Sequence, residues 1–165
     1  MLVPFSKISE HSKLWIFPSS RKFYQQEIPK IKAFIEDFLN SWQDNGENVQ
    51  GSYLLKYNRF ILISADTSDK NLSIEAHDLL TDFILKLETK LNVLLLDKIN
   101  VCYKQGEFVQ YKEFKEFKEL LKNKSVSNKT VVFNNMITTK EELEYYWEIN
   151  IMDSWLGHLV KPHKN

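Results

Sequence analysis

The stretch FILISADTSDKNLSIEAHDLL, residues 60–80, contains the change of pattern that decides the fold. Its apolar run at 60–65 predicts a strand, and the polar loop after it opens an amphipathic helix from about Ser73 to Leu91. Ser73 is the natural N-cap of that helix because its hydroxyl can accept a free backbone N–H. A strand–loop–helix junction of this kind either binds a ligand or only reverses the direction of the chain. Its presence also indicates a domain that contains both helices and strands.

The segments around this stretch extend the pattern. Residues 51–66 are rich in aromatic and β-branched side chains, and they predict either two strands joined at residues 57–59 or one long bent strand. Three further segments complete a βαββαβ order: a strand at 13–17 (KLWIF), a helix from Glu27 to Trp42 and a strand at 99–104. This order predicts an α+β fold with a ferredoxin-like core at about 13–104.

The rest of the chain predicts a C-terminal extension of a hairpin and helices, at about 105–160, within a single domain of residues 1–165. Gly106 in the charged turn 104–107 joins two aromatic segments, as in a hairpin. A lysine-rich helix follows at about 112–123. A ferredoxin-like sheet has one face without helices, and the extension is rich in Phe, Tyr and Trp. We therefore expect the extension to cover part of that face.

Composition excludes several classes of function. The chain has 22 basic and 22 acidic residues, so it lacks the excess positive charge with which a nucleic-acid-binding protein displaces counterions. Its one cysteine, Cys102, cannot form an internal disulfide and is typical of a reducing compartment. The apolar runs FILI and VLLL are too short to span a bilayer, and the first residues lack the pattern of a secretory signal. We therefore expect a cytoplasmic protein.

No cofactor motif is present. The loop after Ala65 has no glycine, and neither G-x-x-x-x-G-K-[ST] nor G-x-G-x-x-G occurs, so a P-loop ATPase or GTPase is excluded. Asp66, Asp69 and Asn71 only loosely suggest a calcium loop, because the glycine and distal glutamate of an EF-hand are missing. The four histidines have no zinc-ligand spacing. We expect no metal and no cofactor.

Five residues are candidates for a ligand site. Asp66 follows a predicted central strand, and together with Ser73 at a helix start it could hold a polar ligand, assisted by Arg59 or Lys104. Lys104 and Glu107 could also act as a charged pair at the hairpin turn. The alternative is that the loop after the strand is only a corner, with Ser73 as the helix cap.

Two other features have competing interpretations. Cys102 could be a nucleophile with Lys104 on the same strand face, but a cysteine in a strand is more often a small buried apolar residue. The segment YKEFKEFKELLKNK, 111–124, interleaves lysines with aromatic residues and could bind RNA. Its phenylalanines recur every three residues, and Lys112 and Glu116 have i,i+4 spacing. An amphipathic helix with a charged outer face explains the same pattern.

Several stretches together resemble a family of small proteins from Bacteroidetes that are often labelled "ABC transporter ATPase". The stretches are MLVPF, LWIFPSSRKF, YNRFILISAD, INVCYKQGEFVQY, KTVVFNN and WEINIMDSWLGH. The label conflicts with the missing Walker A loop. Relatives tend to have a Cys-Ser-Ile-Asp run where this chain has residues 72–75, and their Trp-His pair corresponds to Trp155 and a displaced His158. The resemblance implies a single cytoplasmic domain.

These observations predict a binding or regulatory module, not an enzyme, because no acid, base and nucleophile stand at a recognisable spacing. Its aromatic surplus suits a protein partner or a homodimer. The alternative is a small polar-ligand or hydrolytic site near Asp66 and Ser73. RNA binding through the lysine-rich helix is a third hypothesis.

Overall fold

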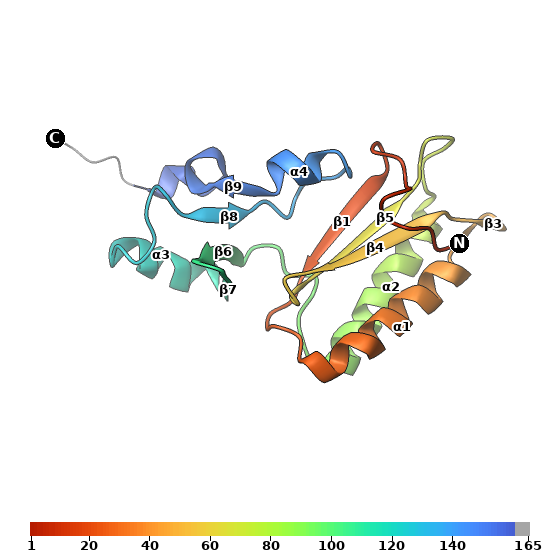
Figure 1. Ribbon diagram of the computed structural model, residues 1–165, viewed down its shortest axis with the longest axis horizontal. Coiled ribbons are helices and arrows are strands. Elements are labelled where there is room, and N and C mark those ends of the chain that lie inside the picture. Colours follow the sequence, from red (N-terminus) through yellow and green to blue (C-terminus); the bar gives the residue numbers. More distant parts are fainter. Residues whose placement is uncertain (161–165) are drawn as a thin grey trace.

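The computed structural model describes residues 1–160 and contains two main antiparallel sheets with helices packed against them (Figure 1). The first sheet has the strand order β1-β5-β4. Its strands and the two helices on one of its faces are β1 (Lys13–Pro18), β4 (Gly51–Lys56), β5 (Phe60–Ala65), α1 (Ile28–Ser41) and α2 (Ile74–Leu91). A mixed fold of helices and strands is therefore confirmed.

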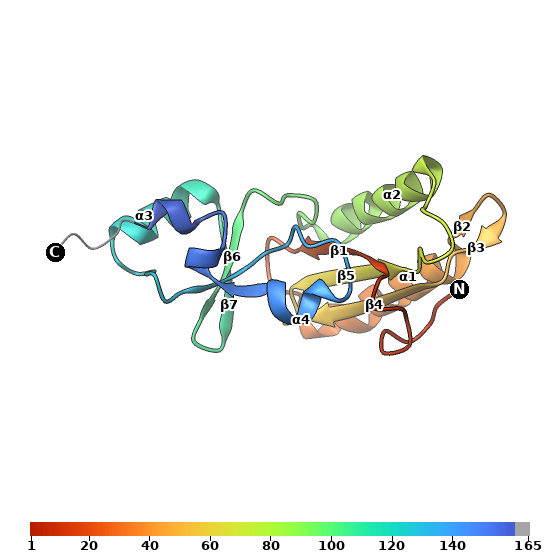
Figure 2. The ribbon, with the colours of Figure 1, turned by 90° about the horizontal axis from the view of Figure 1, so that it is seen from above.

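The second sheet is built by the last third of the described chain, in the order β7-β6-β8-β9. Its elements are β6 (Val101–Gln105), β7 (Phe108–Lys112), α3 (Phe114–Lys122), β8 (Val131–Phe133), α4 (Glu142–Tyr146) and β9 (Glu148–Asn150). Short pieces complete the fold: β2 (Gln43–Asp44), β3 (Glu47–Asn48), and three 3-10 turns at Gln25–Glu27, Ile151–Asp153 and Gly157–Leu159. Figure 2 shows an elongated molecule in which β6, β7 and α3 lie toward one end and the first sheet with α1 and α2 toward the other.

The four-stranded ferredoxin-like sheet expected within residues 13–104 does not form. Three of its strands and both helices are present, but β6 pairs with β7 and β8 instead of β1. Other segments occupy the free edge of β1: the Leu14 N–H donates to the Thr138 carbonyl at 2.8 Å, and the Ser20 N–H just beyond the strand donates to the Leu94 carbonyl at 3.0 Å. Pro18 has no N–H to offer, which suits an edge strand.

Two turns set the registers of the hairpins. Tyr57 and Asn58 both have positive φ, 56° and 50°, and the Arg59 N–H donates to the Lys56 carbonyl at 3.0 Å. This is a type I′ arrangement, whose twist matches the strands that it joins, so 51–66 forms two strands and not one bent strand. The predicted hairpin at 104–107 is also confirmed, with Gly106 at φ 63°.

Three apolar clusters hold the layers together. The first lies between the first sheet and the helices α1 and α2, and it includes Ile31, Ile35, Leu39, Ile61, Ile63 and Ile84. The second lies on the opposite face of the first sheet, where Leu14, Ile16, Phe60 and Leu62 meet Cys102, Phe133, Ile137 and Trp147. The third packs α3 and residues 151–160 against the outer face of the second sheet, around Tyr103, Phe117 and Ile151. The C-terminal extension thus covers part of the open face of the first sheet, as expected.

No helix within residues 1–160 combines the length and the apolar character that a membrane crossing requires.

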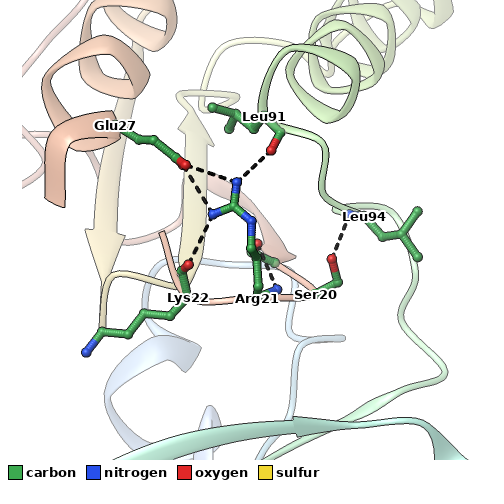
Figure 3. A network of polar contacts seen from close by, with 7 residues as sticks. Ser20, Arg21, Lys22, Glu27, Leu91 and Leu94 are labelled. Carbon is green, nitrogen blue, oxygen red and sulfur yellow. Dashed lines mark hydrogen bonds and ion pairs between the residues drawn. The ribbon is translucent and has the colours of Figure 1, made fainter. Parts of the chain in front are cut away.

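Arg21 joins the ends of the two helices (Figure 3). Its Nη2 donates to the Leu91 carbonyl at 2.6 Å, at the last residue of α2, and to Glu27 Oε1 at 3.0 Å, just before α1. Beside it, the Ser20 hydroxyl accepts the Leu94 N–H at 2.9 Å. The guanidinium therefore satisfies a carbonyl that the end of a helix leaves without an intrahelical partner.

Replacing Arg21 with alanine should lower the free energy of unfolding by about 2 kcal/mol, because charge-assisted bonds to a helix end and to Glu27 are lost together. Urea unfolding measures the loss. Lys22→Ala is the matched control, since the Lys22 side chain is exposed and only its carbonyl contacts Arg21. Equal losses in the two variants would contradict the role assigned to Arg21.

Candidate functional site

The start of α2 is fixed by a pair of residues from distant parts of the chain. The Ser73 hydroxyl accepts the Ala76 N–H at 3.2 Å and donates to Asp44 Oδ1 at 2.7 Å, while the Ser73 N–H donates to Asp44 Oδ2 at 3.0 Å. These hydrogen bonds from Ser73 favour the charged carboxylate and lower the pKa of Asp44. Ser73 is therefore the N-cap that the sequence predicts, and it also anchors the β2–β3 hairpin.

Asp66 is engaged within its own loop. Its carboxylate accepts the Ser68 N–H at 2.9 Å and the Ser68 hydroxyl, and these hydrogen bonds lower the pKa of Asp66. Its N–H donates to the Gln50 carbonyl at 2.9 Å. The bond from the Ser68 N–H to the Asp66 carboxylate forms an Asx turn, in which the aspartate side chain takes the place of a backbone acceptor. The corner interpretation therefore accounts for both Asp66 and Ser73.

A hollow of about 180 Å³ lies beside this corner. It is lined by Asp44, Glu47, Asn48, Val49, Gln50, Asp66, Asp69, Lys70 and Leu72. Lys70, the only cation of this lining, is paired with Glu47 at 3.0 Å. Carboxylates outnumber ammonium groups, so the hollow favours cationic or hydrogen-bond-donating ligands. Within residues 1–160, no group of three or more His, Cys, Asp or Glu is placed to hold a metal ion.

The other three candidates lie elsewhere. Arg59 stands at the opposite end of β5 from Asp66, roughly 20 Å away at the rise of an extended chain. Its Nη1 donates to the Ser19 carbonyl at 3.1 Å, and burial lowers its pKa. Lys104 lies in the second sheet and pairs with Glu148, not with Glu107, which is exposed in the β6–β7 turn. Asp66 lines the hollow together with Asp44, the partner of Ser73, whereas Arg59, Lys104 and Glu107 are not part of its lining.

Lys104 instead belongs to a contact between the two sheets. The Tyr57 hydroxyl, at the tip of the β4–β5 hairpin, donates to Glu148 Oε2 at 2.7 Å, and Lys104 Nζ lies 5.4 Å from the centre of the Tyr57 ring. The same ring meets Phe133 edge-on at 5.5 Å. Sequence reasoning missed this contact because its members come from β6, β9 and a hairpin tip.

Cys102 is a buried apolar residue. Its side chain is in the cluster between the sheets, and burial raises the pKa of its thiol to about 12, although Arg59 and Asn135 act in the opposite direction. A thiol with that pKa is protonated at neutral pH and is a poor nucleophile.

The lysine-rich segment forms α3, with Phe117 buried and Lys112 paired to Glu116 at 3.9 Å. Its pattern is that of an amphipathic helix.

A second surface carries three large apolar side chains. Ile99, Met136 and Trp155 are 71%, 63% and 50% exposed. Met136 and Trp155 line a hollow of about 20 Å³, and Ile99 lies between two residues of the same lining. That lining comprises Lys98, Asn100, Val101, Phe133, Asn134, Asn135, Met136, Trp155 and Leu156. We call Ile99, Met136 and Trp155, with the hollow beside them, the Trp155 face.

The Trp155 ring is held in place by its neighbour. It stacks on Phe114 at the start of α3, with ring centres 5.4 Å apart and planes inclined by 29°. No motif or periodicity in the sequence indicated this surface. Ile99 was expected to begin the strand at 99–104, but β6 begins at Val101. The three residues come from the segment before β6, the segment after β8 and the segment after β9, which are distant in the sequence.

Ser73→Ala should lower the free energy of unfolding at neutral pH by about 1 kcal/mol, through loss of the cap. Further stability is lost because the Ser73 hydroxyl bond to Asp44, the largest cause of the lowered pKa of Asp44, disappears, while the backbone N–H of residue 73 is kept. A carboxylate with a lowered folded-state pKa contributes stability above its ordinary value of 3.8, and this contribution disappears as pH falls through the folded-state pKa. The difference between wild type and variant should therefore be smaller in acid.

Urea unfolding at neutral pH and below pH 3 measures both differences, and Ser68→Ala, which removes the hydroxyl beside Asp66, serves as a comparison. A difference that stays constant down to the lowest pH would show that Asp44 does not contribute through Ser73.

Comparison of the chain with models of protein families, with curated proteins and with solved structures finds no match. The resemblance to the Bacteroidetes family therefore stays a prediction, and the geometry of the two surfaces is the basis for a functional proposal.

Proposed function

We propose that this protein is a protein-binding module that engages a partner chain, or a second copy of itself, through the Trp155 face. The observation that carries the proposal is the exposure of Met136 and Trp155 beside one hollow, with Ile99 exposed in a segment whose neighbouring residues line it. Single exposed apolar residues are common on proteins, but a group of them beside a hollow is typical of an interaction surface. Trp and Met are also enriched at protein interfaces.

The arrangement of Trp155 supports the same proposal. Residues that dominate binding energies are often tryptophans, and they bind best when their rotamer is already fixed in the free protein. Stacking on Phe114 restricts the Trp155 ring while leaving half of its surface exposed. A partner that covers this ring therefore loses little conformational entropy of the side chain on binding.

The test is a double variant, Trp155→Ser with Met136→Ser. Purified wild-type protein is first examined by light scattering for self-association, and is then immobilised to capture partners from a lysate of its source cells. We expect either the dimer or a specific captured protein to be lost in the variant, with binding weakened at least tenfold because two exposed anchors are removed.

Leu85→Ser is the matched control, because Leu85 is 45% exposed on α2, far from the Trp155 face in sequence and on the first sheet's helical layer. Circular dichroism and thermal unfolding check that each variant folds. A monomeric wild type with no captured protein, or association that Leu85→Ser weakens as much as the double variant does, would overturn the proposal.

A second candidate function is the binding of a small cationic or amine-bearing ligand in the hollow beside Asp66 and Ser73. It is favoured by the volume of that hollow, about 180 Å³, and by its acidic lining. Since Asp66 and Asp44 already accept hydrogen bonds from Ser68 and Ser73, the groups offered to a ligand would include Asp69 and Gln50. Hydrolysis is less well supported, because Ser73 itself caps a helix.

Calorimetric titration with a diamine tests this candidate. Binding should fall several-fold in Asp69→Asn and should weaken with added salt, because the attraction is electrostatic and the hollow is open to solvent. Asp97→Asn, at the other sheet, is the control. The candidate fails if wild type shows no heat of binding at low salt, or if Asp69→Asn binds equally well.

A further inference from the structure

We propose that Asn45 is a modification site, at which the side-chain amide is lost as ammonia after attack by the main-chain nitrogen of Gly46. The products are an aspartyl and an isoaspartyl residue. The site lies in the β2–β3 hairpin, at one end of the molecule (Figure 2), and the inference does not depend on the Trp155 face. The isoaspartyl product releases the contact that anchors this hairpin to α2.

The first support is the residue that follows Asn45. Asparagine is among the chemically labile residues of proteins. Asn45 is the only asparagine of the chain that precedes a glycine. Any other residue carries a Cβ that shields its own backbone nitrogen, whereas glycine leaves that nitrogen accessible and its backbone angles free. A Cβ added at Gly46 would meet no atom within 4 Å, so the space around this nitrogen is open.

The second support is that no contact holds the two reacting groups in place. Asn45 and Gly46 form the turn between Asp44 and Glu47, and both are exposed. Neither the Asn45 side-chain amide nor the Gly46 N–H makes a hydrogen bond to any residue that the structure describes. Isolated two-stranded hairpins are marginally stable in water, so this turn opens locally at little cost and reaches the geometry that ring closure needs.

The reaction needs only water as a co-reactant. The Gly46 nitrogen gives up its proton and attacks Asn45 Cγ. The new C–N bond closes a cyclic succinimide, and the Cγ–Nδ2 bond breaks so that the amide nitrogen leaves as ammonia with that proton. The attack is intramolecular, so the nucleophile and the carbon are already neighbours.

Water then attacks one of the two carbonyl carbons of the succinimide and breaks the bond from that carbon to the Gly46 nitrogen. Attack at Cγ leaves an aspartyl residue. Attack at the main-chain carbon leaves an isoaspartyl residue, in which the main chain runs through Cβ and Cγ. Both products carry a carboxylate where Asn45 was neutral.

The structural consequence follows from what the hairpin holds. The Asp44 carboxylate accepts the hydroxyl and the N–H of Ser73 at 2.7 and 3.0 Å, and Glu47 pairs with Lys70 at 3.0 Å. An isoaspartyl residue lengthens the main chain between Asp44 and Glu47 by one carbon atom, and the register of a hairpin is fixed by the length of its turn. The strands then no longer match, and Asp44 is withdrawn from Ser73.

The test is peptide mapping by mass spectrometry of purified protein that is incubated at neutral pH, sampled over time and digested. Asn128 is the internal control, because it is also exposed and lies in a turn, but Lys129 follows it. We expect Asn45 to convert severalfold faster than Asn128. Conversion should be faster in mildly alkaline buffer, because the attacking nitrogen must lose its proton.

Two variants separate control by the structure from control by the local sequence. Ser73→Ala removes one of the bonds that hold Asp44, so the hairpin opens more often and Asn45 should convert severalfold faster than in wild type. Ser68→Ala is the matched control, because it removes a hydroxyl from the neighbouring loop and leaves the contacts of the hairpin in place.

Ion exchange isolates the isoaspartyl protein, which should unfold at a lower urea concentration than the unmodified protein. Replacing Ser73 by alanine should then cost less stability than it costs the unmodified protein, because the bond to Asp44 is already lost and only the cap remains. Conversion of Asn45 at the rate of Asn128, or at equal rates in wild type and Ser73→Ala, overturns the proposal. Isoaspartyl protein of unchanged stability overturns it as well.

Discussion

The packing of Phe60, Phe133 and Trp147 between the two sheets is the contact on which the rest of the structure depends. The ring centres are 4.8 to 5.1 Å apart, and the Trp147 ring meets Phe60 edge-on at an interplanar angle of 79°. Each such pair adds about 1 kcal/mol beyond the burial of its surface. The Trp147 Nε1–H reaches Asn135, so the one polar atom of the cluster has a partner. This contact fixes the second sheet against the first, and with it the segments that form the Trp155 face.

The elements that depend on local pattern were predictable. The spacing of apolar residues located α1 and α2, the cap at Ser73 located the start of α2, and Gly106 located the β6–β7 turn. The partner of β6 was not predictable from those patterns, because strand pairing depends on which edges are free. Thr138 and Leu94 occupy the edge of β1, and no periodicity within either segment indicates this. The ferredoxin-like expectation therefore held for five elements and failed at the sixth.

The candidate site was also predictable only where it depends on local sequence. Sequence reasoning placed Asp66 and Ser73 near each other because one short loop joins them. In the structure Ser73 bonds Asp44, and Asp44 lines the same hollow as Asp66. The hydrogen bonds of Asp66 to Ser68 and of Ser73 to Asp44 were not predicted. Asp44 lies 29 residues from Ser73 in the sequence, so no local pattern connects them. Arg59 and Lys104 were added on chemical grounds alone, and the extended strand β5 separates Arg59 from Asp66. The Trp155 face could not be found because exposure is a property of the assembled chain.

The covering of the first sheet by the last third of the chain has a consequence during synthesis. The ribosome releases the first sheet and both of its helices before any residue of the second sheet has emerged, so Leu14, Ile16, Phe60 and Leu62 then have no cover. A nascent chain of this kind exposes a flat apolar surface and an open strand edge, the two features that promote aggregation. Synthesis of Phe133 and Trp147 ends this exposure, because their side chains cover the sheet face.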